Sequence, residues 1–183
     1  AIAASVSEDE GRTWEVVGTL PMFPRVETAA PGGYAFLAEP HVVEVSPGHL
    51  LGMARYEARP YVEGRRRCVL WQFTSADGGV TWTEPTPTEI LGKPPHLLKL
   101  HDGRILVTYG YRHPPFGQRA CLSDDGGTTW GDAMILRADA PNGDLGYPAT
   151  VQRDDGMLLT VYYQVEPPDE MTSLMLTRWR LDA

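Results

Sequence analysis

Cysteine and asparagine are scarce in this 183-residue chain, which has two cysteines and one asparagine. Two cysteines do not make a disulfide framework, so we interpret Cys68 and Cys121 as free, buried thiols. Asn142 is followed by Gly-Asp, which is not an N-glycosylation acceptor sequence. The opening residues lack the basic region and apolar block of a secretory leader. The sequence therefore leaves the cellular location open.

Long apolar runs and an excess of positive charge are also missing. No stretch approaches the roughly 20 apolar residues of a membrane-spanning helix, so we expect no membrane partner. The formal net charge is −8, which argues against nucleic acid as a partner. No cluster of histidine, cysteine and carboxylate residues has the spacing of metal ligands, and we expect no cofactor.

What the chain does contain is one pattern, S-x-D-x-G-x-T-W, in three copies that we call Asp boxes: Ser7–Trp14, Ser75–Trp82 and Ser123–Trp130. The box aspartates Asp9, Asp77 and Asp125 can accept hydrogen bonds from backbone N–H groups just downstream. The glycine of each box can take the positive φ that a tight turn needs, and the tryptophan can cover the turn. We interpret the boxes as structural turns, with calcium or carbohydrate binding by the aspartates as the alternative.

A second repeat lies between the boxes, where PHVVEVSPG begins at Pro40, PHLLKLHDG at Pro95 and PATVQRDDG at Pro148. Each glycine opens another apolar stretch, which indicates a strand, a tight turn and a second strand. Together with the strands on either side of a box, this gives four antiparallel strands, A to D, in about 54 residues. No helical periodicity is present. The sequence therefore predicts an all-β fold of propeller blades.

The strands can be counted as C-D, then A-B-C-D twice, then A-B-C, or about three to three and a half blades. We expect a single partial propeller domain over 1–183, with a blade remnant at 1–30, blades at about 36–92 and 93–142, and a last blade at 143–183. A propeller needs at least about four blades to close. We therefore expect the remaining blades to come from a longer parent chain or from a second copy in a homodimer.

The three boxes make the chain resemble the sialidase (neuraminidase) superfamily of six-bladed propellers, as the C-terminal half of its domain. The resemblance implies four site residues. Glu39, in AEPHVVEVSPGHLLGMAR, looks like the family's glutamate, and Arg55 looks like the arginine sixteen residues later. Arg119, in GQRACLSDDGG, looks like the next arginine, and Tyr147, in DLGYPATVQRDDG, looks like the tyrosine of the last blade. A secreted or periplasmic location is implied by this resemblance alone.

The implied activity is that of a retaining exo-glycosidase whose ligand is sialic acid or a glycoconjugate that carries it. The sugar's carboxylate would repel an anionic nucleophile, so a neutral phenol, Tyr147, suits the attack, with Glu39 as its base. Arg55 and Arg119 would bind the carboxylate. Glu39 and Tyr147 both directly precede a repeat proline, so both begin an innermost strand beside the central axis. His41 and His96 follow repeat prolines and could line the same mouth.

The sequence departs from the family pattern in two ways. The family's third arginine and its aspartate acid/base lie in the first blade, and no residue here matches either. The DLGYP context also differs, so another 2-keto acid sugar or a uronic acid would suit the site as well. A non-catalytic carbohydrate- or protein-binding propeller is the alternative, because Asp boxes also occur in propellers without activity.

Overall fold

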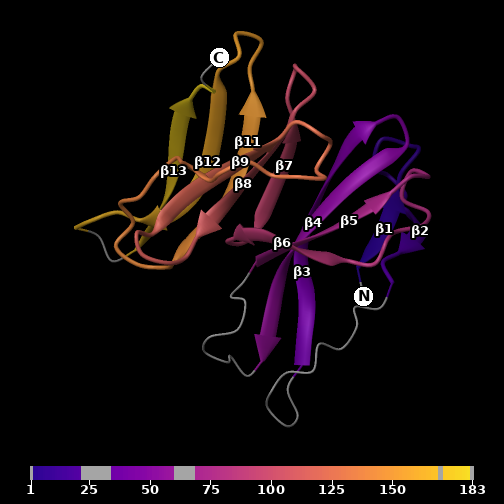
Figure 1. Cartoon of the computed structure of the whole chain (residues 1–183), viewed down its shortest axis with the longest axis horizontal. Helices are drawn as coiled ribbons and strands as arrows, with labels where there is room; N and C mark the ends of the chain where they lie inside the picture. The colour runs from indigo at the N-terminus through magenta and orange to yellow at the C-terminus, as the bar shows by residue number, and fades with distance from the viewer. Residues whose placement is uncertain (1, 22–33, 60–68, 169–170, 182–183) are drawn as a thin grey trace. The chain divides into compact units, whose positions relative to one another are not determined.

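The computed structural model describes residues 2–21, 34–59, 69–168 and 171–181 of the chain. Within these ranges every regular element is a β-strand, as Figure 1 shows. The described residues include no helix that could cross a membrane. The chain divides into two compact units, Ala1–Glu89 and Ile90–Ala183. The predicted all-β fold is confirmed.

The first unit contains a two-stranded and a four-stranded antiparallel sheet, with neighbours in chain order. The smaller sheet pairs β1 (Ala3–Val6) with β2 (Glu15–Thr19). The larger sheet consists of β3 (Tyr34–Ser46), β4 (His49–Arg59), β5 (Val69–Ser75) and β6 (Thr86–Leu91). Leu20, which follows β2, forms a buried apolar cluster with Ala54 and Phe73 of the larger sheet, and Trp82 of the second Asp box packs against this cluster. The tryptophan of the second Asp box thus connects the turn of that box to the buried cluster.

The second unit contains a four-stranded and a three-stranded sheet, again antiparallel and in chain order. The first consists of β7 (Pro95–Lys99), β8 (Ile105–Tyr111), β9 (Gly117–Ser123) and β10 (Met134–Ile135). The second consists of β11 (Leu145–Gln152), β12 (Leu158–Val165) and β13 (Thr172–Trp179), drawn in orange to yellow in Figure 1. These sheets reproduce the blade pattern predicted from the repeats.

A buried ladder of hydroxyl groups crosses the second unit. Thr150 Oγ1 lies 3.0 Å from Thr108 Oγ1 and 3.0 Å from Thr160 Oγ1. Trp179 Nε1 donates to Thr160 Oγ1 at 2.9 Å. Because the four residues belong to β8, β11, β12 and β13, the ladder ties the two sheets together. The apolar core beside it comprises Leu100, Leu106, Ala120 and Leu158.

The prediction that both cysteines are free and buried can be compared with the structure only for Cys121. Cys121 is free and buried, as predicted, and Tyr109 OH lies 3.5 Å from its Sγ. Burial raises the pKa of the Cys121 thiol. Cys68 lies outside the described residues.

Candidate functional site

Glu39 and Tyr147 share an unusual backbone conformation. Glu39 in β3 has a φ of 53° and Tyr147 in β11 has a φ of 52°. Each lies where the pairing register shifts, between Ala38 and His41 in one strand and between Gly146 and Ala149 in the other. Such a bulge admits an extra residue and redirects its side chain. Two repeat-equivalent positions are therefore bent in the same way.

This conformation is costly for residues other than glycine, because the Cβ atom crowds the backbone. Among the described residues, Glu10 in the first Asp box is the only other non-glycine residue with positive φ, whereas ten glycines have it. Apart from Glu10, Glu39 and Tyr147, every described residue with positive φ is therefore a glycine. At Glu39 and Tyr147 the chain instead keeps a residue with a Cβ atom and a long side chain.

Arg55 on β4 lies between two carboxylates. Its Nη1 donates to both Oε1 and Oε2 of Glu39 at 3.0 Å. Its Nε donates to Oε1 of Glu57 at 2.7 Å, and Nη2 donates to the same oxygen. Burial alone would lower the pKa of Arg55, but Glu57 and Glu39 outweigh it and raise that pKa. The two residues sixteen positions apart in the sequence are thus brought into direct contact.

Glu57 is the part of this group that the sequence analysis missed. It is 6% exposed and lies two residues after Arg55 on the same strand. Alternate residues of a strand face the same side, so the Arg-x-Glu spacing was the available signal. His41, also in β3, is partly buried, and burial lowers the pKa of its ring. A lowered pKa keeps that imidazole neutral at neutral pH.

In the second unit, Tyr147 packs beside Tyr163 of β12. The ring centroids are 5.9 Å apart, and half of Tyr147 is exposed. Tyr163 OH donates to Asp144 Oδ1 at 3.0 Å and accepts from Arg112 Nη2 at 3.3 Å. Burial raises the pKa of Tyr163, Arg112 lowers it, and Asp144 adds to the rise. The candidate nucleophile therefore has a polar cluster at its side, which the sequence analysis did not identify.

Arg119 on β9 is bound mainly to backbone. It is 5% exposed and donates to the carbonyl oxygens of Gln118 at 3.0 Å, Pro115 at 2.9 Å, and Arg137. Its guanidinium lies 4.7 Å from the ring centroid of Tyr111. Burial lowers the pKa of this arginine. The described contacts of Arg119 are therefore those of a guanidinium that braces the local chain.

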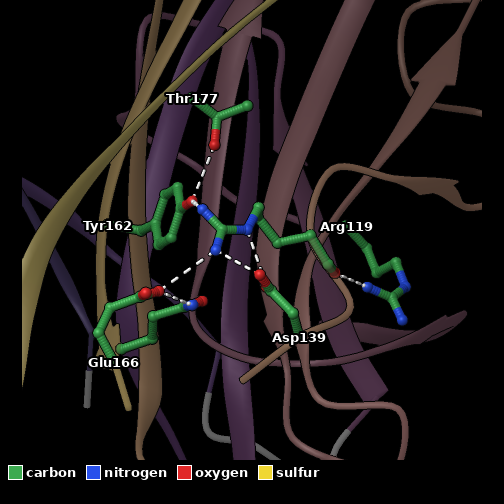
Figure 2. Close-up of polar contacts among 7 residues, drawn as sticks. Arg119, Asp139, Tyr162, Glu166 and Thr177 are labelled. Atoms are coloured by element: carbon green, nitrogen blue, oxygen red, sulfur yellow. Dashed lines mark hydrogen bonds and ion pairs between the residues drawn. The ribbon is translucent and has the colours of Figure 1, made fainter. Parts of the chain in front are cut away.

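Arg137 extends this bracing to the last sheet, where it contacts Tyr162 and Glu166. Figure 2 labels these two partners together with Asp139 and Thr177. The Arg137 guanidinium donates to Asp139, to Glu166 Oε1 at 3.2 Å and to Tyr162 OH at 3.3 Å. Tyr162 OH in turn lies 2.8 Å from Thr177 Oγ1. Hydrogen bonding to Asp139 raises the pKa of Arg137, and Arg137 lowers the pKa of Asp139. This network joins the segment after β10 to β12 and β13.

His96 contacts the neighbouring sheet. Its Nδ1 on β7 accepts from the backbone N–H of Thr150 at 3.4 Å.

The box aspartates are held by hydrogen bonds within their own boxes. In each Asp box the aspartate accepts from the serine hydroxyl and from the backbone N–H and hydroxyl of the threonine four residues later. These bonds hold the pKa of each box aspartate at about 2; the three are Asp9, Asp77 and Asp125. No group of metal-ligating side chains is found among the described residues.

The sheets, hairpins and boxes define the chain as part of a sialidase-type β-propeller. The profile of the BNR repeat-like domain family matches residues 1–160, and the chain belongs to that family. A search of curated proteins found no significant match.

Solved structures extend the likeness. A Dyadobacter fermentans protein of unknown function is 28% identical, with a TM-score of 0.78 over 96% of this chain and 44% of its own. A Hadza microbial sialidase is 17% identical, with a TM-score of 0.63 over 94% of this chain and 37% of its own. A xylan β-1,4-xylosidase from Bacillus halodurans is 14% identical, with a TM-score of 0.65 over 92% of this chain and 33% of its own. The chain thus spans less than half the length of these proteins, and the last two show the fold alone.

Proposed function

We propose that the chain is part of a retaining exo-glycosidase that acts on sialic acid or a related acidic sugar. The observation that carries the proposal is the shared left-handed backbone of Glu39 and Tyr147. Strain of this kind is often kept where a side chain must be aimed at a ligand. The solved structures with this fold include proteins named as a sialidase, a xylosidase and an arabinofuranosidase, which supports a glycosidase more than a particular sugar.

The proposed roles follow from the chemistry of the side chains. Tyr147 attacks the anomeric carbon, since a neutral phenol is not repelled by a carboxylate on that carbon. Glu39 takes the phenolic proton as the attack proceeds. Arg55 fixes the Glu39 carboxylate through its two Nη1 hydrogen bonds and, with Arg119, binds the acid group of the substrate. His41 and His96 are proposed as further ligand contacts.

The proposal includes partners that complete the ring. Protonation of the leaving group requires an acid that none of the assigned residues supplies. We propose that the remaining blades, from a parent chain or a second copy, provide that acid and a further arginine. Without them we expect the rate to fall by orders of magnitude.

The test is hydrolysis of an aryl sialoside and an aryl glucuronide by a form with all blades present, with the anomeric form of the product followed by NMR. We expect retention of configuration, and a loss of at least about a thousandfold in kcat for Tyr147→Phe. Tyr34→Phe is the matched control, because Tyr34 is 60% exposed and stacks on Phe36. Undiminished turnover by Tyr147→Phe, or an inverted product, would refute the assignment.

A non-catalytic binding propeller is the second candidate. The observation that favours it is the state of the two assigned arginines, whose guanidinium groups already donate to protein acceptors. Binding of an acidic sugar without any turnover of its aryl glycoside, in a form with all blades present, would establish this function instead.

A further inference from the structure

Arg112, directly after β8, is the arginine beside Tyr147. Its Nη2 donates to Tyr163 OH at 3.3 Å, and the Tyr163 ring packs against the Tyr147 ring at 5.9 Å. Its neighbour Tyr111, the last residue of β8, has its ring packed against the guanidinium of Arg119. The two neighbours therefore have different partners: Arg112 contacts Tyr163 of the last sheet, and Tyr111 contacts Arg119.

The three arginines differ in how many of their five N–H donors are in use. Within the described residues, Arg55 uses four donors on Glu39 and Glu57. Arg119 uses three donors on backbone carbonyl oxygens. Arg112 uses one, and its Nε is buried without an acceptor. Arg112 is thus the guanidinium with the most donors left for a ligand.

The surroundings of Arg112 leave its charge without a direct carboxylate partner in the described part of the chain. Asp144 reaches it only through the hydroxyl of Tyr163, which bridges the two. Two glycines, Gly143 and Gly146, lie beside the side chain. A Cβ at Gly143 would lie 3.8 Å from Arg112 Cβ, and a Cβ at Gly146 would lie 3.4 Å from Nη2. Gly146 directly precedes Tyr147, so the guanidinium lies close to the candidate nucleophile.

We propose that Arg112 binds the carboxylate of an acidic sugar and so sets the preference for an acidic ligand. A guanidinium with free Nη donors suits a planar carboxylate, and it stays charged at any physiological pH. This inference rests on the proposed function, because it takes the ligand to be the acidic sugar that Tyr147 would attack. Under this inference Arg112, and not Arg119, is the main residue that recognises the acid group, because more of its N–H donors are unused.

The test measures binding and not turnover. The probes are N-acetylneuraminic acid and its methyl ester, and D-glucuronic acid and D-glucose, each titrated against the full chain by NMR. For Arg112→Gln we expect the acids to bind about tenfold to a hundredfold more weakly, since a hydrogen bond to a charged group is lost. The ester and the neutral sugar should bind as before. Arg112→Lys, which keeps the charge without the planar guanidinium, should retain part of the preference for acids.

Arg153→Gln is the matched control. Arg153 lies in the turn between β11 and β12, with its side chain 58% exposed. An unchanged preference for acids in both Arg112 variants would overturn the inference, as would a wild-type chain that binds acid and ester equally. Thermal unfolding of each variant checks the fold, and Arg112→Lys provides the test if Arg112→Gln does not fold.

The two proposals fail separately. Loss of the acid preference in Arg112→Gln without any glycosidase activity would keep the inference and discard the enzyme. Hydrolysis that depends on Tyr147 but not on Arg112 would keep the enzyme and discard the inference.

Discussion

The left-handed backbone at Glu39 and Tyr147 can be tested by stability alone. The perturbation is a pair of substitutions at each position, one to alanine and one to glycine. Both variants lose every side-chain atom beyond Cβ, so their difference reports the effect of the Cβ atom on the backbone. At an ordinary extended position, glycine is less stable than alanine by about 0.5–1 kcal/mol, because it loses more conformational freedom on folding. A left-handed residue with a Cβ costs about 1–2 kcal/mol.

The φ values of 53° and 52° place both residues in this left-handed region, where the second effect is the larger. We therefore expect each glycine variant to be more stable than its alanine partner by about 0.5–1 kcal/mol. The control is Ala149→Gly, two residues after Tyr147 on the same strand and exposed. There we expect the usual sign, a loss of about 0.5–1 kcal/mol.

The measurement is urea unfolding followed by far-UV circular dichroism and tryptophan fluorescence, with equal m values required within each pair. Coincident transitions from the two probes are needed before a free energy of unfolding is assigned. Alanine variants as stable as the glycine variants at both positions would refute the reasoning. The expected sign would show that the chain keeps Glu39 and Tyr147 at a cost in stability.

Two further predictions concern the scaffold. Thr150→Val should destabilise the second unit by about 2 kcal/mol, because the buried Thr108 hydroxyl loses its described side-chain partner and Thr160 keeps only Trp179. Adding Thr108→Val should cost less than the sum of the two single changes, and additive urea unfolding data would count against this ladder. The Asp boxes should weaken in acid. Their aspartates have folded pKa values of about 2, below the ordinary 3.8, so their stabilisation is present above about pH 4 and lost as pH falls towards 2; the residues are Asp9, Asp77 and Asp125. Thermal unfolding between pH 5 and pH 2 tests this, and a variant with all three replaced by asparagine should lose that part of the pH dependence.

The sheets could be predicted because their determinants are local and repeated. A box needs only its own serine, aspartate, glycine and threonine to close its turn, and these hydrogen bonds recur in all three copies. The turn glycines Gly48, Gly103 and Gly156 all have positive φ, which gives each hairpin the same register signal. The order of the strands in each blade could therefore be predicted from the spacing between the boxes and the turn glycines.

The contacts of the candidate site could be predicted only in part, because they depend on residues far apart in the chain. The sixteen-residue spacing of Glu39 and Arg55 corresponds to a real hydrogen-bonded pair. Nothing in the sequence indicates that Arg119 donates to the carbonyl oxygens of Pro115 and Arg137, because those depend on how the loops fold back. An arginine matched by motif position alone can thus have its donors already occupied.

Arg119 and Arg112 show how one pair of sheets can use two arginines differently. Arg119 binds the carbonyl oxygen of Arg137, and the Arg137 side chain binds Glu166 and Tyr162 of the last sheet. Replacement of Arg119 would therefore disturb the packing of the sheets before it reported on any ligand, so loss of activity in that variant could not assign its role. Arg112 makes a single described hydrogen bond, and its replacement leaves the Arg137 network in place. Of these two arginines, Arg112 is the one whose mutation separates ligand recognition from the fold.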